Sequence, residues 1–174
     1  VFTELKEYYK QTSESDTTKI SFYEDTYSLY NLYRFAHYYE EAYGKYIWLK
    51  SGASLVIEHT EAMTVIDVNT GSVLKKKKQE DTLFYQINRE AAKEIARQLR
   101  LRNISGIIMI DFINMKDTAQ KEKLLSLLDS ECKKDRVHCN VIDMTALNLV
   151  EMTRSKVRKP LHEQIRSCMK NNRS

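Results

Sequence analysis

Hydrophobic residues recur along this chain with two different periods, which predict strands and helices. Short apolar runs, several of them rich in β-branched residues, are typical of strands. One run is almost uninterrupted, which is typical of a strand buried on both faces. The predicted strands are residues 46–50, 54–58, 62–69, 107–113 and 140–144.

Three segments have the spacing of helices instead. Residues 28–43 hold apolar residues at helical intervals, and Gly44 suits the end of that helix. Residues 88–102 predict a second helix, with Asn88 as its N-cap and arginines near its C-terminal end. Residues 116–136 predict a third helix.

From residue 62 onward the predicted order is strand, helix, strand, helix, strand. This order predicts an α/β fold with a mixed, mainly parallel sheet, right-handed crossovers and flanking helices. The two strands that precede residue 62 join the edge of this sheet in an antiparallel sense.

The composition is that of an ordinary globular domain, with 42% hydrophobic residues, one proline and four glycines. No stretch approaches the roughly 18 uncharged apolar residues that a membrane span needs, and the first residues lack the pattern of a signal peptide. Cys132, Cys139 and Cys168 show no C-x-x-C pairing and fit a reducing compartment. We therefore expect a cytoplasmic protein that does not enter a membrane.

The net charge of +4 conceals an uneven distribution. Residues 1–66 have 6 Lys and Arg against 10 Asp and Glu, whereas residues 67–174 have 22 against 14. The second part suits a polyanion, although a solvated surface of mixed sign gives the same counts. Ten of the eleven tyrosines lie in the first 46 residues, where half-buried packing is favoured over a platform for stacked bases.

Three predicted strands, TVIDVN, IMIDFI and NVIDM, each carry a single acid near the carboxyl end, namely Asp67, Asp111 and Asp143. In a parallel sheet these ends share one side, where ligands bind in open α/β folds. Neighbouring buried carboxylates repel one another, and a divalent cation such as Mg²⁺ removes that cost. Asn69 shares a face with Asp67 and can orient it. The alternative is that these acids cap helices or pair with arginine.

Two other classes of enzyme are disfavoured. The segment after the first acid-bearing strand, VNTGSVLKKKK, has neither G-x-G-x-x-G nor G-x-x-x-x-G-K, the motifs that cradle nucleotide phosphates. The four histidines are scattered, and no Ser or Cys stands in a glycine-flanked elbow, so a nucleophile triad is poorly supported.

Three blocks of the sequence resemble the catalytic part of the ribonuclease E/G family. They are LKSGASLVIEHTEAMTVIDVNTG (49–71), INREAAKEIARQLRLRNISGIIMIDFINM (87–115) and LVEMTRSKVRKPL (149–161). The resemblance implies an endoribonuclease that cleaves single-stranded RNA with Mg²⁺, for which Mn²⁺ can substitute. It implies a ribonuclease H-like segment over residues 1–45, a DNase I-like catalytic subdomain over 46–161 and a C-terminal tail over 162–174.

The resemblance also assigns roles to individual residues. By motif, Asp67 and Asp111 bind the metal and Asn69 orients Asp67. Zinc is not expected, because the family's C-x-x-C link would begin near Cys168 and Asn171 stands three residues later. That link holds the family's dimers and tetramers together, so we expect a monomer or weak dimer here, whereas a full-length chain can oligomerise.

Two positions depart from the family pattern. The family usually reads IDFIDM where this chain has Asn114, and often has glycine at the place of Asp143, which is therefore dropped from the metal site. A catalytically weak or inactive module that binds RNA or protein is thus the alternative function. The residues expected to hold the RNA backbone are Lys75, Lys76, Arg97, Arg100, Arg102, Arg154, Lys156 and Arg158.

Overall fold

The structure, a computed structural model, describes residues 2–12, 20–71 and 80–171. The chain divides into two compact units, residues 1–37 and 38–174, which are considered separately. The first unit contains the helices α1 (Phe2–Thr12) and α2 (Leu29–Leu32), and α3 (Phe35–Tyr43) spans the boundary. The domain limits expected after residues 45 and 161 stay predictions.

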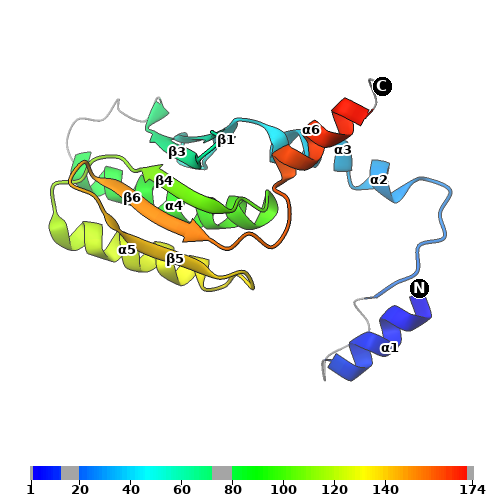
Figure 1. Cartoon of the computed structure of the whole chain (residues 1–174). Coiled ribbons are helices and arrows are strands. Elements are labelled where there is room, and N and C mark those ends of the chain that lie inside the picture. Colours follow the sequence, from blue (N-terminus) through cyan, green and yellow to red (C-terminus); the bar gives the residue numbers. More distant parts are fainter. Residues whose placement is uncertain (1, 13–19, 72–79, 172–174) are drawn as a thin grey trace. The chain divides into compact units, whose positions relative to one another are not determined.

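The second unit is built on one sheet of six strands in the order β1-β2-β3-β4-β6-β5 (Figure 1). Only β3 and β4 pair in parallel, and the other neighbours are antiparallel. The expected α/β class and the mixed sheet are confirmed, but the sheet is not mainly parallel. The strands are β1 (Tyr46–Trp48), β2 (Ser54–His59), β3 (Met63–Asn69), β4 (Gly106–Asp111), β5 (Cys139–Met144) and β6 (Leu149–Arg154).

The parallel prediction was wrong because it missed β6, which enters the sheet between β4 and β5. A tight turn joins β5 to β6, and in it the backbone of Asn148 adopts a φ of 64°, which Asn tolerates better than most residues. Val150 and Met152 then alternate into the core, as a half-buried strand requires. A hairpin partner therefore occupies the place beside β4 that a parallel β5 would have taken.

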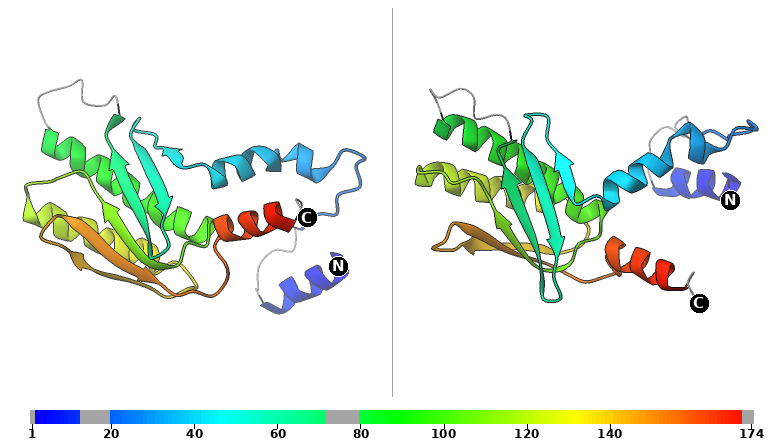
Figure 2. Two further views of the ribbon diagram at one scale, coloured as in Figure 1. Left: turned by 45° about the horizontal axis from the view of Figure 1, so that its top comes forward. Right: turned by 90° about the horizontal axis from the view of Figure 1, so that it is seen from above.

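One face of the sheet is covered by two long helices, α4 (Glu80–Leu101) and α5 (Thr118–Cys132) (Figure 2). The alternate residues of β3 and β4 that point to this side, such as Ile66, Ile108 and Ile110, are fully buried. They pack on an apolar stripe of α4 that includes Ala92, Ile95 and Leu99, so the core lies between sheet and helices. The opposite face is open among the described residues, and Ile107 on that face is 49% exposed.

The start of α4 differs from the expectation. The helix begins at Glu80, and Asn88, which was expected to cap it, is fully buried within it. The side chain of Asn88 donates to the carbonyl oxygen of Ile113 at 2.7 Å and accepts from its backbone N–H at 3.0 Å. The N-cap prediction was therefore wrong, and Asn88 instead fixes the chain just beyond β4. The third helix has its cap at Asp117, which accepts from the N–H of Ala119.

The segment expected as a tail contains a further helix, α6 (Leu161–Asn171). Its first residue donates its N–H to the carbonyl oxygen of Arg102 at 2.9 Å, so the start of α6 is tied to the end of α4. None of the helices that the structure describes is long and apolar enough to cross a membrane.

The loop that precedes β5 depends on a buried ion pair between Arg154 and Asp135. Arg154 donates from Nε to Asp135 Oδ2 at 2.9 Å, and its Nη1 reaches Asn103 Oδ1 and the carbonyl oxygen of Ile104, each at 2.9 Å. Partial burial acts to raise the pKa of Asp135, but the hydrogen bonds, above all the one from Arg154, lower it overall. Arg154 therefore stabilises the fold.

We predict that Arg154→Ala lowers the free energy of unfolding by about 3–5 kcal/mol, because it leaves a buried carboxylate without its partner. Arg158→Ala is the matched control, since Arg158 is exposed and its loss should change stability by less than about 0.5 kcal/mol. Urea unfolding of both variants measures the difference. Equal stability of the two variants would contradict the assigned role.

Candidate functional site

The candidate site is a pair of carboxylates at the carboxyl ends of the two parallel strands. Asp67 of β3 and Asp111 of β4 are register partners, so their side chains project from the same, open face of the sheet. Adjacent strands lie about 4.8 Å apart, which brings the two acids side by side. Asp67 is half-buried and Asp111 is exposed.

The electrostatics of the pair are those of two like charges held together. Partial burial, followed by the negative charge of Asp67, raises the pKa of Asp111 above its ordinary value. Asn69, two residues along β3, donates from Nδ2 to Asp67 Oδ2 at 2.6 Å. The amide therefore fixes the orientation of the Asp67 carboxylate.

The residues present fit a hard divalent cation that takes most of its ligands from water and substrate. Within the described ranges, no group of three or more His, Cys, Asp or Glu side chains is arranged so that it could hold a metal ion by itself. Two carboxylates alone form an incomplete ligand set, and Mg²⁺ commonly accepts such a set together with waters and substrate phosphate. Mn²⁺ accepts the same oxygen ligands.

Polar residues of α4 hold the backbone around the acid pair. Asn88 anchors Ile113, immediately after the strand that ends with Asp111. Glu90 accepts from the N–H groups of Lys50 and Ser51 at 2.7 and 3.2 Å, which fixes the loop between β1 and β2.

The sequence reasoning did not assign these positioning roles. A signal existed for Asn88, because it falls on the apolar stripe of α4 at the helical spacing from Ala91, Ala92 and Ile95. A polar residue on such a stripe must find a partner inside the protein.

Close packing shapes the same end of the sheet. Gly71 has a φ of +57°, and a Cβ there would lie 2.6 Å from the carbonyl oxygen of Gly52. Only glycine fits this backbone contact, which brings the end of β3 against the loop between β1 and β2.

Most of the basic residues expected to bind RNA make contacts within the protein. Arg97 pairs with Glu94 at 2.9 Å. Arg100 donates to the carbonyl oxygen of Glu131 at 3.3 Å. Arg102 is buried and donates to Gln98 Oε1 at 2.7 Å and to the carbonyl oxygen of Gly44 at 2.8 Å. Arg154 is buried as described above.

The structure also separates Arg154 from the acid pair. In the β4–β6 ladder, Asp111 lies opposite Leu149, whereas Arg154 lies opposite Gly106 at the other end of the strands. Lys156 and Arg158 follow Arg154 and are exposed, with Lys156 Nζ 3.8 Å from a carboxylate oxygen of Glu163. Lys75 and Lys76 lie outside the described residues.

Asp143 does not join the acid pair. It lies opposite Glu151 of β6, which lies opposite Met109 of β4, so two strand spacings separate Asp143 from β4.

Two lysines that the sequence reasoning overlooked lie closer to the acid pair. Lys50 and Lys116 are exposed in the loops at the acid end of the sheet. The available signal was that Lys50 ends one predicted strand and Lys116 lies in the short segment of chain that follows another.

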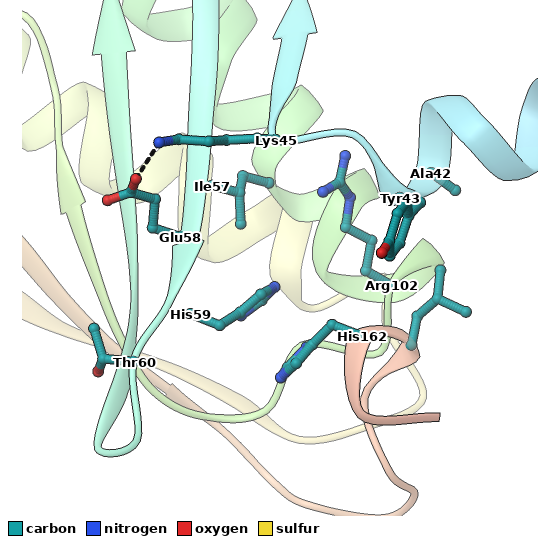
Figure 3. Close-up of a pocket in the computed structure, with 10 residues that line it drawn as sticks. Ala42, Tyr43, Lys45, Ile57, Glu58, His59, Thr60, Arg102 and His162 are labelled. Atoms are coloured by element: carbon teal, nitrogen blue, oxygen red, sulfur yellow. Dashed lines mark ion pairs between the residues drawn. The ribbon is translucent and has the colours of Figure 1, made fainter. Parts of the chain in front are cut away.

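A separate pocket of about 430 Å³ lies at the other end of β2 (Figure 3). Its lining includes His59 of β2 and His162 of α6, whose rings point toward one another and stack with centroids 3.7 Å apart. Burial, followed by the neighbouring His162 and Arg102, lowers the pKa of His59 to about 4. His59 Nδ1 also lies 3.0 Å from the hydroxyl of Thr64. The neutral pair therefore packs α6 against β2.

Comparison with known proteins agrees with the class that the fold and the acid pair define, an α/β domain with a carboxylate site at strand ends. The sequence model of the Ribonuclease E/G family matches residues 1–157. The chain belongs to this family, and the resemblance read from its motifs is confirmed.

Relatives in several bacteria show the extent of the similarity. The chain is similar to Ribonuclease G of Haemophilus influenzae, with 40% identity over 160 residues, which cover 92% of this chain and 32% of the relative. Ribonuclease G of Escherichia coli is 41% identical over 145 residues, 83% of this chain and 29% of the relative. Ribonuclease E of a Nostoc strain is 35% identical over 162 residues, 91% and 23% of the two chains. The chain thus spans about a third or less of the length of these relatives.

We predict that Asp111→Asn stabilises the fold at neutral pH, because it removes the cost of partly burying a charge and the repulsion from Asp67. The carboxylate is mostly exposed, so the gain should stay below about 1 kcal/mol, or roughly 1–3 °C in Tm. Differential scanning calorimetry in a chelator measures it, with Asp143→Asn as the control for an exposed strand acid. A lower Tm for Asp111→Asn than for the control would contradict the repulsion.

We also predict that His59 makes the fold sensitive to mild acid. The pKa of His59 is lower in the folded than in the unfolded chain, so the unfolded chain takes up the proton first as pH falls below 6.5. Its contribution is complete above pH 6.5 and falls toward pH 4, with about 1 kcal/mol lost by pH 5 after screening. Urea unfolding of His59→Gln should show a smaller loss over this range than wild type. The exposed His138→Gln should behave as wild type does.

Proposed function

We propose that this chain is the catalytic module of a metal-dependent endoribonuclease that cleaves single-stranded RNA. One observation carries the proposal: Asp67 and Asp111 are register partners on the two parallel strands, with Asn69 bound to Asp67. The names of the relatives, Ribonuclease G and Ribonuclease E, support it. The proposed reaction is hydrolysis of a phosphodiester bond that leaves a 5′-phosphate and a 3′-hydroxyl.

The two carboxylates would hold Mg²⁺, or Mn²⁺ in its place. When bound, such an ion lowers the pKa of a water ligand and stabilises negative charge on a phosphate. Asn69 would keep one Asp67 oxygen in place, and Asn88 would hold the backbone that follows Asp111. These contacts are formed before substrate arrives, so the site needs little rearrangement to receive a phosphate.

Positive charge near the acids would attract the RNA backbone. Lys50 and Lys116 are the exposed lysines described at this end, and Lys75 and Lys76 belong to the segment that follows β3. Lys156 and Arg158 are exposed at the far end, where they would contact a longer strand. We do not include Arg102 and Arg154, because both are buried and bound within the fold.

A second function is favoured by one observation. Asn114 is exposed in the loop after β4, three residues beyond Asp111, where the family usually has an acid. Without that acid the domain would bind RNA or a protein but cleave weakly or not at all.

We predict that the wild-type chain binds Mn²⁺, measured by electron paramagnetic resonance, and that Asp67→Asn/Asp111→Asn weakens this binding at least tenfold. Asp143→Asn is the matched control and should bind as wild type does, because it lies outside the pair. In a cleavage assay with labelled single-stranded RNA and Mg²⁺, Asp67→Asn should lose activity but keep RNA affinity.

Two outcomes would contradict the proposal. Equal Mn²⁺ affinity of the double variant and wild type would place the metal elsewhere. Metal binding without cleavage, followed by cleavage in Asn114→Asp, would favour the binding module and identify the missing acid as the cause.

A further inference from the structure

Two large aromatic side chains lie on the open face of the sheet, at its β1 edge. Tyr46 is 58% exposed and Trp48 is 73% exposed, whereas Ile47 between them is buried in the core. Successive residues of a strand point to opposite faces, so the burial of Ile47 fixes its two neighbours on the side away from α4 and α5.

The register of the sheet connects Tyr46 with the acid pair. Tyr46 lies opposite Val56, Val56 lies opposite Asp67, and Asp67 lies beside Asp111. Residues that are directly opposed in paired strands project from the same face. Tyr46 and the two acids therefore share one row across the sheet, with about 10 Å, two strand spacings, between Tyr46 and Asp67.

The next row connects Trp48 with Asn69 in the same way. Trp48 lies opposite Ser54, which lies opposite Asn69. The side chains between the aromatic pair and the site are those of Ser54, which is buried, and Val56, which is half-buried. A planar group of a ligand can therefore lie against Trp48 while another group of the same ligand reaches the two acids.

We propose that Tyr46 and Trp48 form a stacking platform for unpaired bases of an RNA strand whose phosphate lies at Asp67 and Asp111. This inference rests on the proposed function and adds the residues that hold the strand beside the site. Stacking of a base on an aromatic ring is worth about 1–3 kcal/mol and tolerates any base, because every base has a π-face.

The charge next to the platform suits a nucleotide. Lys45 Nζ lies 5.7 Å from the ring centroid of Tyr46, and the same ammonium pairs with Glu58 on the neighbouring strand. A cation beside an aromatic ring offers both a phosphate contact and a base contact. The bases of a duplex are stacked on one another, so the platform would favour single strands.

Packing within the domain does not explain these two side chains. Tyr85 of α4 shows what packing looks like, because it is half-buried against the core. Trp48 instead leaves most of its surface in water, which is unusual for the largest apolar side chain. The edge strand has only three residues, which limits strand addition by another protein.

Trp48 is the single tryptophan of the chain, so its fluorescence reports on the platform directly. The chain, kept in a chelator to prevent cleavage, is titrated with a ten-nucleotide single-stranded RNA, an RNA duplex, and an abasic oligomer of the same length and charge. We expect saturable quenching by the single strand alone. In fluorescence anisotropy with labelled RNA, Trp48→Ala should raise Kd at least about fivefold, and Trp48→Phe should keep most of the affinity.

Leu147→Ala is the control, because Leu147 is also exposed but lies in the turn between β5 and β6. Circular dichroism melts check that all variants fold. Unchanged Kd for Trp48→Ala, or equal quenching by the abasic oligomer, overturns the platform.

The two proposals fail separately in these experiments. If wild type binds Mn²⁺ but Trp48→Ala leaves the RNA Kd unchanged, the platform is overturned and the metal site stands. If single-stranded RNA quenches Trp48 but wild type binds no Mn²⁺, the platform stands and the nuclease proposal is overturned.

Discussion

The pairing of β3 with β4 is the constraint on which the rest of the structure depends. These two strands form the parallel pair of the sheet, and their register places Asp67 beside Asp111. A parallel pair requires a crossover, and here α4 supplies it. The same helix covers the core with one stripe and carries Asn88 and Glu90, which hold the loops at the acid end. The helix α4 is therefore both the crossover between the two parallel strands and the support of the site.

Placing two carboxylates together works against folding and prepares the site for a cation. Partial burial and then the repulsion from Asp67 raise the pKa of Asp111, and the hydrogen bond from Asn69 limits the freedom of Asp67. A fold tolerates such a conflict when the surrounding structure is stable, and here the two strands continue into a core of fully buried residues such as Ile66 and Ile110. Two acids that repel one another, held at strand ends by a rigid core, are what a metal site with few protein ligands requires.

The two faces of the sheet have different tasks. The covered face carries the stabilising contacts, including the cluster around Arg154 and the histidine pair that packs α6. The open face carries the acids, Asn69 and the exposed aromatic residues of β1. Substitutions on the first face are expected to act through stability, whereas those on the second act mainly through binding, with a small effect on stability where they remove the charge of Asp111.

Sequence alone determined the family, the α/β class, the five strands that were predicted and the acids at two strand ends, because periodicity and motifs are local properties. Asp67, Asn69 and Asp111 could be found in this way, although their roles stay predictions. The sequence alone could not place β6 between β4 and β5, because the order of the strands depends on which hairpin pairs with the free edge of β4. Nor could the sequence show that Arg102 and Arg154 are buried, because an arginine in a sequence does not indicate whether its side chain faces water or a partner such as Asp135. Only the tertiary structure decided those partners, because burial is set by contacts between residues far apart in the chain.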